Sequence, residues 1–346
     1  MSEYTISEVY RSDKRAYAQI DRLLDQEGIR RDPNLDYTCA MYDEDMHIIA
    51  TGSCFGNTLR CMAVDHTHQG EGLMNEIVSH LIDVQSNRGN IHLFLYTKCS
   101  SEKFFASLGF HEIARIEDQI VFMENRRTGF ESWLNSLETK EGKTVGAVVM
   151  NANPFTLGHQ YLAEYASAHC DVLHLFMVSE DASIFPFRAR KKMVMDGTAH
   201  LKNIIYHDSG PYIISAATFP SYFQKDERAV IESHAMLDLT VFTKIAKRLG
   251  INVRFVAEEP TSLVTGIYND IMSSLLEENG IRCEIIERKK SGDMVISAST
   301  VRQAIHDGNR ELLEQLVPET TLNWLDSEEA VPVINKIRKS TDLIHY

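Results

Sequence analysis

The second half of the chain alternates short apolar runs with longer stretches in which apolar residues recur at helical spacing. The apolar runs predict buried strands at residues 145–150, 172–178, 204–206, 253–257 and 283–286. The helical spacing predicts helices at about residues 159–169, 189–201, 239–249, 268–279 and from 299 onward. Short, almost wholly apolar strands between helices favour a parallel sheet that is covered on both faces. Ligands of such sheets bind beyond the carboxyl ends of the strands.

The first half has shorter helices and a predicted hairpin, which indicates a different kind of sheet. The predicted strands are residues 39–42, 48–54, 59–64 and 92–96, and the predicted helices begin near Leu73 and Lys103. A polar run at residues 138–143 separates the two halves. We therefore predict an α/β protein of two domains. Residues 1–138 form a mixed-sheet α+β domain, and residues 143–338 form a Rossmann-like domain with a parallel sheet.

Length and charge agree with two globular domains and narrow the possible partners. The chain has 346 residues, of which 44% are hydrophobic and 24% are charged. The formal net charge is −14, and no long stripe of lysine and arginine interrupts the acidic composition. A large nucleic-acid footprint is therefore not expected. A local cationic pocket for a nucleotide stays open as an interpretation.

Cysteine spacing and the N-terminal sequence indicate a cytoplasmic protein that does not associate with membranes. The six cysteines are scattered and include no Cys-x-x-Cys pair, which favours reduced thiols over disulfides or a zinc site. The first residues are too polar for a signal peptide. The apolar run 172–178 is too short to cross a bilayer.

The most informative stretch runs from Asn151 to His159 and directly follows the predicted strand 145–150. Pro154 can hold the loop off the helix that follows, and Thr156 is a plausible cap for that helix. Gly158 leaves no side chain over the helix N-terminus. Such an end presents free backbone N–H groups and the positive end of the helix dipole, which suits polyphosphate. The chain contains no Gly-x-x-x-x-Gly-Lys-Ser/Thr loop, which argues against a P-loop.

Two blocks resemble the nucleotide site of the nucleotidyltransferase superfamily. Thr156-Leu-Gly-His159 resembles its first motif, and Ile296-Ser-Ala-Ser-Thr-Val-Arg302 resembles its Ile-Ser-x-Ser/Thr-x-x-Arg element. The resemblance implies that His159, Thr156 and Arg302 stabilise charge on the triphosphate during adenylyl transfer. It implies ATP contacts from Asn153, Pro154, Phe155, Gly158, Arg188, Ser297, Ser299 and Thr300. Mg²⁺ is expected to bridge the phosphates, and no metal ligand from the protein is evident.

Two cationic segments accompany these blocks. Arg188 belongs to a group of cations at the start of a predicted helix, where like charges oppose the helix dipole and indicate a bound anion. Residues 288–290 either close over the phosphates or are solvated, and we interpret Lys289 and Lys290 as solvated. The run from Thr300 to Gln303 has the form of a capping box, so the last helix is predicted to start there.

The N-terminal half resembles the GNAT family of N-acetyltransferases at one loop. Gln69 and Gly72 match the first two fixed positions of its Gln/Arg-x-x-Gly-x-Gly/Ala pyrophosphate loop, between a predicted strand and a predicted helix, and Met74 stands where the pattern has a small residue. The resemblance implies that Gln69, Gly70 and Gly72 bind a coenzyme A-like group. Phe105 stands where that family has a tyrosine that serves as a general acid, and phenylalanine cannot donate a proton. We therefore expect the fold without acetyl transfer to an amine. A tight turn that binds no ligand stays open as an interpretation.

The order of the two halves resembles the citrate lyase ligase family, and further stretches match it at residues 178–187, 264–269 and 287–289. The resemblance implies an ATP-dependent ligase that forms acetyl-adenylate from acetate and releases pyrophosphate. The acetyl group then passes to the prosthetic-group thiol of the citrate lyase acyl carrier subunit. That group derives from dephospho-coenzyme A, so we expect the loop from Gln69 to Gly72 to bind it.

Three other interpretations remain open. A nucleotidyltransferase that joins AMP to a pantetheine phosphate or a mononucleotide would share both motifs and show no dependence on acetate. An N-acetyltransferase with an ATP-sensing domain would consume acetyl-coenzyme A without ATP. A regulatory module would hold the nucleotide and turn nothing over, and it would use the same Thr156, His159 and Arg302.

Overall fold

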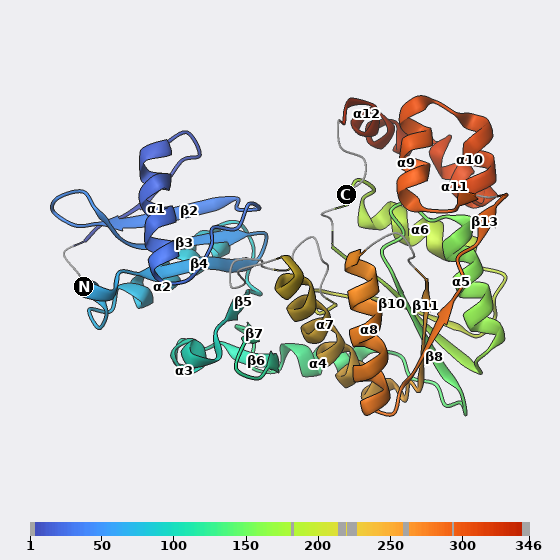
Figure 1. The fold of residues 1–346 in the computed structure, drawn as a ribbon, viewed down its shortest axis with the longest axis horizontal. Coiled ribbons are helices and arrows are strands. Elements are labelled where there is room, and N and C mark those ends of the chain that lie inside the picture. The colour runs from blue at the N-terminus through green and yellow to red at the C-terminus, as the bar shows by residue number, and fades with distance from the viewer. Residues whose placement is uncertain are drawn as a thin grey trace. The chain divides into compact units, whose positions relative to one another are not determined.

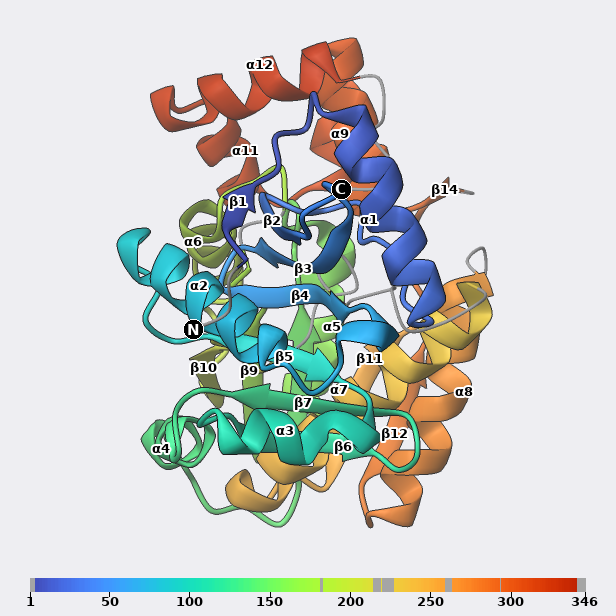
Figure 2. The same cartoon turned by 90° about the vertical axis from the view of Figure 1, so that its left-hand side faces the viewer.

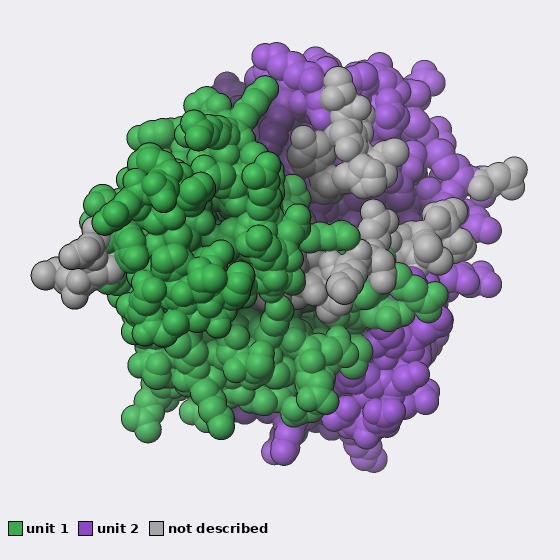
Figure 3. Space-filling view, turned by 60° about the vertical axis from the view of Figure 1, so that its left-hand side comes forward, with its two compact units in different colours: residues 1–133, 218–240 green, residues 134–217, 241–346 purple. Residues whose placement is uncertain are grey.

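The computed structural model of the chain describes residues 4–180, 183–213, 219, 227–258, 263–292 and 294–340. It divides into two compact units, each with its own sheet (Figures 1 and 3). Unit 1 comprises residues 1–133 and 218–240, and unit 2 comprises residues 134–217 and 241–346. Residues 227–240, the first part of a long helix, therefore cluster with unit 1, although they lie inside the predicted range 143–338 of the second domain.

Unit 1 is built on a mixed sheet with the strand order β1-β2-β3-β4-β5-β7-β6 (Figure 2). Its strands are β1 (Ile6–Glu8), β2 (Tyr37–Tyr42), β3 (Ile48–Phe55), β4 (Thr58–Val64), β5 (Phe94–Thr97), β6 (His111–Ile116) and β7 (Ile120–Glu124). Its helical segments are α1 (Lys14–Gln26), η1 (His66–His68), α2 (Leu73–Asn87), η2 (Cys99–Ser101) and α3 (Glu102–Ser107), and α4 (Gly129–Ser136) follows. Within the sheet, β4 and β5 are parallel, and the neighbouring pairs on either side are antiparallel.

Alternating side chains bury this sheet on both faces. On β2, Cys39 and Met41 belong to the apolar cluster that contains residues of α2, whereas Ala40 belongs to the cluster of α1. α1 presents Ala16, Ile20, Leu23 and Leu24 to the core at the spacing of one helical face. Buried residues thus alternate every second position on the strand and recur every three to four positions on the helix. These two spacings determine which face of the strand packs against which helix.

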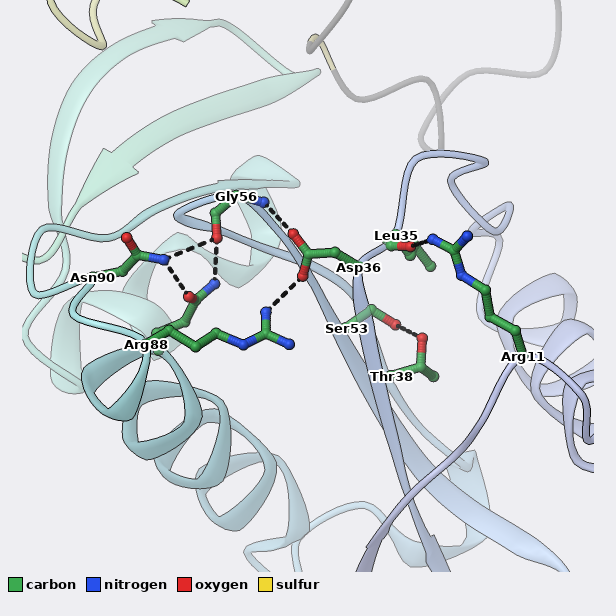
Figure 4. Close-up of polar contacts among 9 residues, drawn as sticks. Arg11, Leu35, Asp36, Thr38, Ser53, Gly56, Arg88 and Asn90 are labelled. Carbon is green, nitrogen blue, oxygen red and sulfur yellow. Dashed lines mark hydrogen bonds and ion pairs between the residues drawn. The ribbon is translucent and has the colours of Figure 1, made fainter. Parts of the chain in front are cut away.

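Polar contacts tie the turn after β3 to the C-terminal end of α2 (Figure 4). The Asp36 carboxylate accepts from the backbone N–H of Gly56 at 2.7 Å and from Arg88 Nη1 at 2.7 Å. Gln85, which is buried, donates to the Gly56 carbonyl at 2.7 Å. The turn therefore satisfies its backbone groups with side chains from the loop before β2 and from α2.

Unit 2 is built on a parallel sheet with the strand order β10-β9-β8-β11-β12. Its strands are β8 (Val145–Met150), β9 (Val172–Met177), β10 (Ile204–Asp208), β11 (Val253–Ala257) and β12 (Arg282–Ile286). Its helices are α5 (Leu157–Ala168), α6 (Phe187–Gly197), the part of α7 (Glu227–Leu249) from residue 241 onward, α8 (Leu263–Glu278), α9 (Ala298–Asp307), α10 (Arg310–Leu316), α11 (Glu319–Leu325) and α12 (Val331–Lys339), with a short turn η3 (Glu328–Ala330). A small antiparallel pair, β13 (Lys290–Ser291) and β14 (Met294–Val295), precedes α9.

The strand order places a topological switch point between β8 and β11. The chain leaves β8 toward β9 and β10 on one side and later returns to β11 and β12 on the other. Connections that diverge in this way leave a crevice outside the carboxyl ends of the strands, which is where open α/β sheets bind ligands. The loop that starts at Asn151 begins directly after β8 and so lies at this crevice.

The predicted fold class is confirmed. The structure adds elements that the sequence did not predict, among them β1, β6, β7, α1, α10, α11 and α12, and some predicted helices begin elsewhere. α7 begins at Glu227 rather than near residue 239, because Ser233, His234 and Asp238 are buried polar residues that interrupt the apolar stripe. α9 begins at Ala298, earlier than the capping box at Thr300 predicts. No helix of the described residues is long and apolar enough to cross a membrane.

Candidate active site

A cavity of about 650 Å³ lies at the switch point of the unit 2 sheet. The carboxyl-terminal residues of β8 and β11, the first turns of α5 and α9, and residues of α8 line it. From the first motif it contains Thr156, Gly158 and His159. From the second block it contains Ser297, Ser299, Thr300 and Arg302. The structure therefore brings both sequence blocks to one cavity.

Thr156 caps α5 through a reciprocal pair of hydrogen bonds with His159. The backbone N–H of His159 donates to Thr156 Oγ1 at 3.3 Å, and the backbone N–H of Thr156 donates to His159 Nδ1 at 3.1 Å. Thr156 has an extended backbone, as an N-cap requires. The predicted cap is confirmed. Because the imidazole takes the place of the Glu or Gln of an ordinary capping box, the cap also fixes the orientation of the ring.

This cap determines which nitrogen of His159 carries the proton. Nδ1 accepts from a backbone N–H, so in the neutral ring the proton lies on Nε2. Burial of the ring, and to a smaller extent the charge of Arg288, lower the pKa of His159 to about 4. The side chain is therefore a neutral imidazole at pH 7 with Nε2–H as its donor. Such a donor can stabilise a developing negative charge without itself taking part in proton transfer.

The start of α9 gathers three hydroxyl groups. Ser297 is the N-cap, and its Oγ accepts from the backbone N–H of Thr300 at 3.1 Å. The Ser297 hydroxyl also lies 2.8 Å from Ser299 Oγ and 2.7 Å from Thr300 Oγ1. The helix therefore begins one residue before the predicted start at residue 299, and its N-cap is Ser297 and not Thr300. The hydroxyl cluster and the open N–H groups of the first turn form a second site that suits an anion.

Arg302 connects the two blocks inside the protein. Its Nη1 donates to the Asn153 carbonyl at 2.6 Å, and its side chain is 3% exposed. A Cβ added to Gly158 would lie 3.4 Å from the Ile296 carbonyl oxygen, so the first turn of α5 lies close to the residue before the α9 cap. Arg302 therefore fixes the loop after β8 against α9, and it also lines the cavity.

Three predicted ATP contacts shape the loop and do not line the cavity. Asn153, Pro154 and Phe155 are buried, and the peptide bond before Pro154 is cis. Asn153 Oδ1 accepts from the backbone N–H of Phe185 at 3.1 Å. The Phe155 carbonyl accepts from Thr321 Oγ1 at 3.1 Å. These contacts hold the loop in place, so the geometry supports a positioning role for all three residues.

Arg188 is exposed and does not line the cavity either. Three other cations of α6 have partners within the protein itself. Arg190 is buried and donates to the carbonyls of Phe185, Asn151, Val178 and Glu180. Lys191 pairs with Asp208 and Lys192 with Asp196, both at 2.7 Å. An ATP contact from Arg188 stays a prediction that the geometry does not support.

The cavity is cationic although the whole chain is acidic. Arg254, Arg288, Lys289 and Arg302 line it together with the carboxylate of Glu287. Lys289 is half-buried and its Nζ lies 5.9 Å from the centre of the Tyr161 ring, whereas Lys290 is exposed. Arg254 was missed. The available signal was a charged residue inside the apolar strand 253–257.

A second cavity, of about 580 Å³, lies in unit 1 where β4 and β5 separate. These strands pair only at Thr58 with Phe94 and Leu59 with Leu95, and the residues that follow on both strands line the cavity. Gln69, Gly70 and Gly72 line it as well. Gly70 and Gly72 have φ values of +92° and +84°, a region that favours glycine, and Gly72 is the N-cap of α2. The predicted loop therefore adjoins a cavity at a helix N-terminus.

Neither cavity contains a preformed site for a metal ion built from protein ligands alone. Among the described residues, no group of three or more His, Cys, Asp or Glu side chains could hold an ion. Mg²⁺ in nucleotide sites commonly keeps several waters and binds one or two carboxylates besides the phosphates. Glu287 is a carboxylate that lines the unit 2 cavity, so the residues fit an ion that arrives with a nucleotide.

Several solved acetyltransferase structures align with the first third of the chain. An acetyltransferase of the GNAT family from Staphylococcus aureus is 15% identical, covers 36% of this chain and 99% of its own, and gives a TM-score of 0.30. The glucosamine-6-phosphate N-acetyltransferase of Arabidopsis thaliana is 18% identical, covers 34% of this chain and 96% of its own, and gives a TM-score of 0.28. The fold of unit 1 rests on its own strand order.

Comparison with curated proteins covers nearly the whole chain. A family model for the citrate lyase ligase C-terminal domain matches residues 145–325. The citrate pro-3S-lyase ligase of Haemophilus influenzae is 38% identical over 322 residues, which are 91% of this chain and 96% of that protein. The enzyme of the same name from Escherichia coli is 37% identical over 327 residues, which are 92% of this chain and 93% of that protein. Since these relatives are 37–38% identical over about nine tenths of its length, this chain belongs to the citrate lyase ligase family.

Proposed function

We propose that the protein is an ATP-dependent ligase that activates acetate as acetyl-adenylate, releases pyrophosphate and acetylates the prosthetic-group thiol of the citrate lyase acyl carrier subunit. Membership of the citrate lyase ligase family supports the reaction class. The observation that carries the proposal is the meeting of two capped helix N-termini in one cationic cavity at the switch point of the sheet.

In the first step, an oxygen of the acetate carboxylate attacks the α-phosphorus of ATP, and the bond from that phosphorus to the pyrophosphate oxygen breaks. The step needs in-line positioning and charge stabilisation and little proton chemistry. His159 supplies a neutral Nε2–H donor, and the hydroxyls of Ser297, Ser299 and Thr300 supply further donors. Arg302 holds the two donor sets together through the Asn153 carbonyl.

Charge in the cavity favours the same substrate. Four cationic side chains and one carboxylate line it among the described residues, and the chain as a whole carries −14. A polyanion is therefore attracted to this cavity and repelled by most of the remaining surface. Mg²⁺, when bound with ATP, neutralises part of the phosphate charge, and Glu287 is the side chain that would hold it.

In the second step, the carrier thiol loses its proton and attacks the acetyl carbon, and AMP leaves. We assign the prosthetic group to the cavity of unit 1, where Gln69, Gly70 and Gly72 adjoin the N-terminus of α2. Backbone N–H groups at that position suit the pyrophosphate of a dephospho-coenzyme A derivative. Phe105 is buried and lines the same cavity, and it offers no proton to a thiolate.

Exchange of labelled pyrophosphate into ATP tests the first step. We expect exchange that requires acetate and Mg²⁺ and needs no carrier subunit. Exchange that proceeds equally without acetate would support a nucleotidyltransferase with another acceptor. Consumption of acetyl-coenzyme A without ATP would support an N-acetyltransferase. Binding of ATP with no turnover under any of these conditions would leave a regulatory module.

Substitutions in the intact chain test the second step. A cut near residue 138 would separate residues 227–240 from the unit with which they cluster, so deletion of the N-terminal half is a poor test. We expect Gln69→Ala and Gly72→Ala to weaken acetyl transfer to the carrier and to leave acetate-dependent exchange within about twofold. Loss of both activities to the same extent would contradict the assignment of the arm to unit 1.

A further inference from the structure

Arg254 is a buried cation in the middle of the sheet of unit 2. It lies on β11, opposite Ala147 of β8 and Cys283 of β12, and its side chain is 5% exposed. Its guanidinium carbon lies 4.2 Å from the centre of the Phe242 ring, which belongs to α7. The side chain therefore points to the α7 face of the sheet, away from α5, where the neighbouring Phe255 meets Tyr165.

Within the described part of the chain, this guanidinium has too few partners for a buried charge. Its Nε and Nη1 are buried and have no hydrogen-bond acceptor, and no ion pair joins it to a carboxylate among those residues. Stacking on the Phe242 ring is a favourable cation–π contact, but it satisfies none of the N–H donors of the guanidinium. A buried ion without hydrogen-bond acceptors is destabilising, so the stacking alone does not account for the buried charge. A buried cation that keeps unused donors beside a cavity indicates an anionic ligand.

The surroundings of Arg254 describe the size and shape of that ligand. Arg254 lines the same cavity as His159, on the side of α8. Arg254 pairs with Ala147 of β8. Val256 follows Arg254 by two residues and Val149 follows Ala147 by two, so both valines lie on the same face of the sheet as Arg254, nearer its carboxyl edge. Met272 of α8 completes an apolar wall. The cavity thus has a cation two residues inside the carboxyl edge of the sheet and apolar side chains between that cation and the edge. This arrangement suits a small carboxylic acid.

We propose that Arg254 binds the carboxylate of the acid substrate and that Val149, Val256 and Met272 contact its alkyl group. The inference rests on the proposed function and deepens it, because it assigns the acid to a definite part of the cavity. The planar guanidinium matches the geometry of a carboxylate. A carboxylate oxygen that accepts one hydrogen bond retains a lone pair for attack on phosphorus. The rival ligand for the same cation is a phosphate of ATP.

Separate Michaelis constants distinguish the two anions. Arg254→Gln removes the charge and keeps a side chain of similar reach. We expect the KM for acetate in pyrophosphate exchange to rise about 10- to 100-fold, the range for a lost hydrogen bond to a charged group, with the KM for ATP within twofold. Lys290→Gln removes an exposed cation that does not line the cavity and is the matched control, with unchanged KM values for acetate and ATP. A rise in the KM for ATP alone in Arg254→Gln would overturn the proposal.

Direct acetate binding separates this inference from the proposed function. In the absence of ATP, acetate should raise the melting temperature of the wild-type protein and should not raise that of Arg254→Gln. An equal shift in both proteins, or no shift in the wild type, would overturn the inference even if exchange depends on acetate. Acetate binding that requires Arg254 in a protein without exchange activity would instead refute the proposed reaction and retain the site.

The apolar wall offers a second, independent variant. Val256→Ala removes two methyl groups from a half-buried position that lines the cavity. If the alkyl group of the acid contacts this side chain, the ratio of kcat/KM for propionate to that for acetate should rise, since one methylene in an apolar pocket changes kcat/KM by about 10- to 200-fold. An unchanged ratio, together with an unchanged KM for acetate in Arg254→Gln, would place the acid elsewhere.

Discussion

His159→Asn separates the proposed catalytic function of His159 from its structural function as part of the helix cap. The asparagine carbonyl oxygen can replace Nδ1 as the acceptor of the Thr156 N–H, at present 3.1 Å away, but asparagine places no donor where Nε2 lies. Removal of one preorganised donor to a developing charge costs about 2.7–4 kcal/mol, or a factor of about 100 to 1,000 in turnover. His159→Ala removes the donor and half of the capping box, which adds a loss of about 1 kcal/mol in folding stability.

The assay is acetate-dependent pyrophosphate exchange, with the melting temperature measured on the same samples. We expect both variants to lose at least tenfold in exchange, and only His159→Ala to lose a few degrees in melting temperature. His169→Ala is the matched control, because this exposed histidine lies at the other end of α5 and bonds the Tyr165 carbonyl. Full exchange activity in His159→Asn would refute the role of Nε2 and leave His159 as a cap only.

Three further predictions concern stability. Burial lowers the pKa values of His174 and His207 to about 4, compared with about 6.5 in the unfolded chain, so unfolding takes up protons between pH 4 and pH 6.5. The free energy of unfolding should therefore fall as the pH drops from 6.5 to 4. Urea titrations should show a smaller fall over this range in His207→Asn than in the wild type. In Gly197→Ala the new Cβ would lie 2.4 Å from the Phe155 ring, so calorimetry should show a loss of about 1–3 kcal/mol, and an unchanged stability would mean that Phe155 is free to move. Thr156→Val should lose about 0.5–2 kcal/mol in chemical denaturation and Thr156→Ser should lose little, because only serine retains the capping hydroxyl, and equal losses would contradict the cap.

Local sequence determined the elements that carry the site. The apolar run before Asn151 fixed β8, and the threonine three residues before His159 fixed the start of α5, since a cap depends only on residues within one helical turn. The same locality explains the error at α9. Ser297 and Thr300 are both residue types that can cap a helix. The extended backbone at Ser297 makes this residue the N-cap of α9, and the sequence alone does not show that conformation.

Residues whose function depends on distant partners could not be assigned in this way. Arg188 and Arg190 stand two positions apart in one cationic run, yet only Arg190 points into the protein, where carbonyls of two other loops accept from it. Arg302 was expected at the phosphates and was found to bond the Asn153 carbonyl, 149 positions away in sequence. Such contacts depend on the order of the strands in the sheet. The spacing of apolar and polar residues along the chain does not reveal that order.

The sequence by itself determined the alternation of strand and helix, the presence of two capped helix starts and the resemblance to a ligase family, because each depends on residues close together along the chain. The tertiary structure decided that the two starts share one cavity, that residues 227–240 cluster with unit 1, and that Arg254 faces α7 beside that cavity. The physical reason is that strand order and the burial of a charge are settled by packing between segments far apart in sequence.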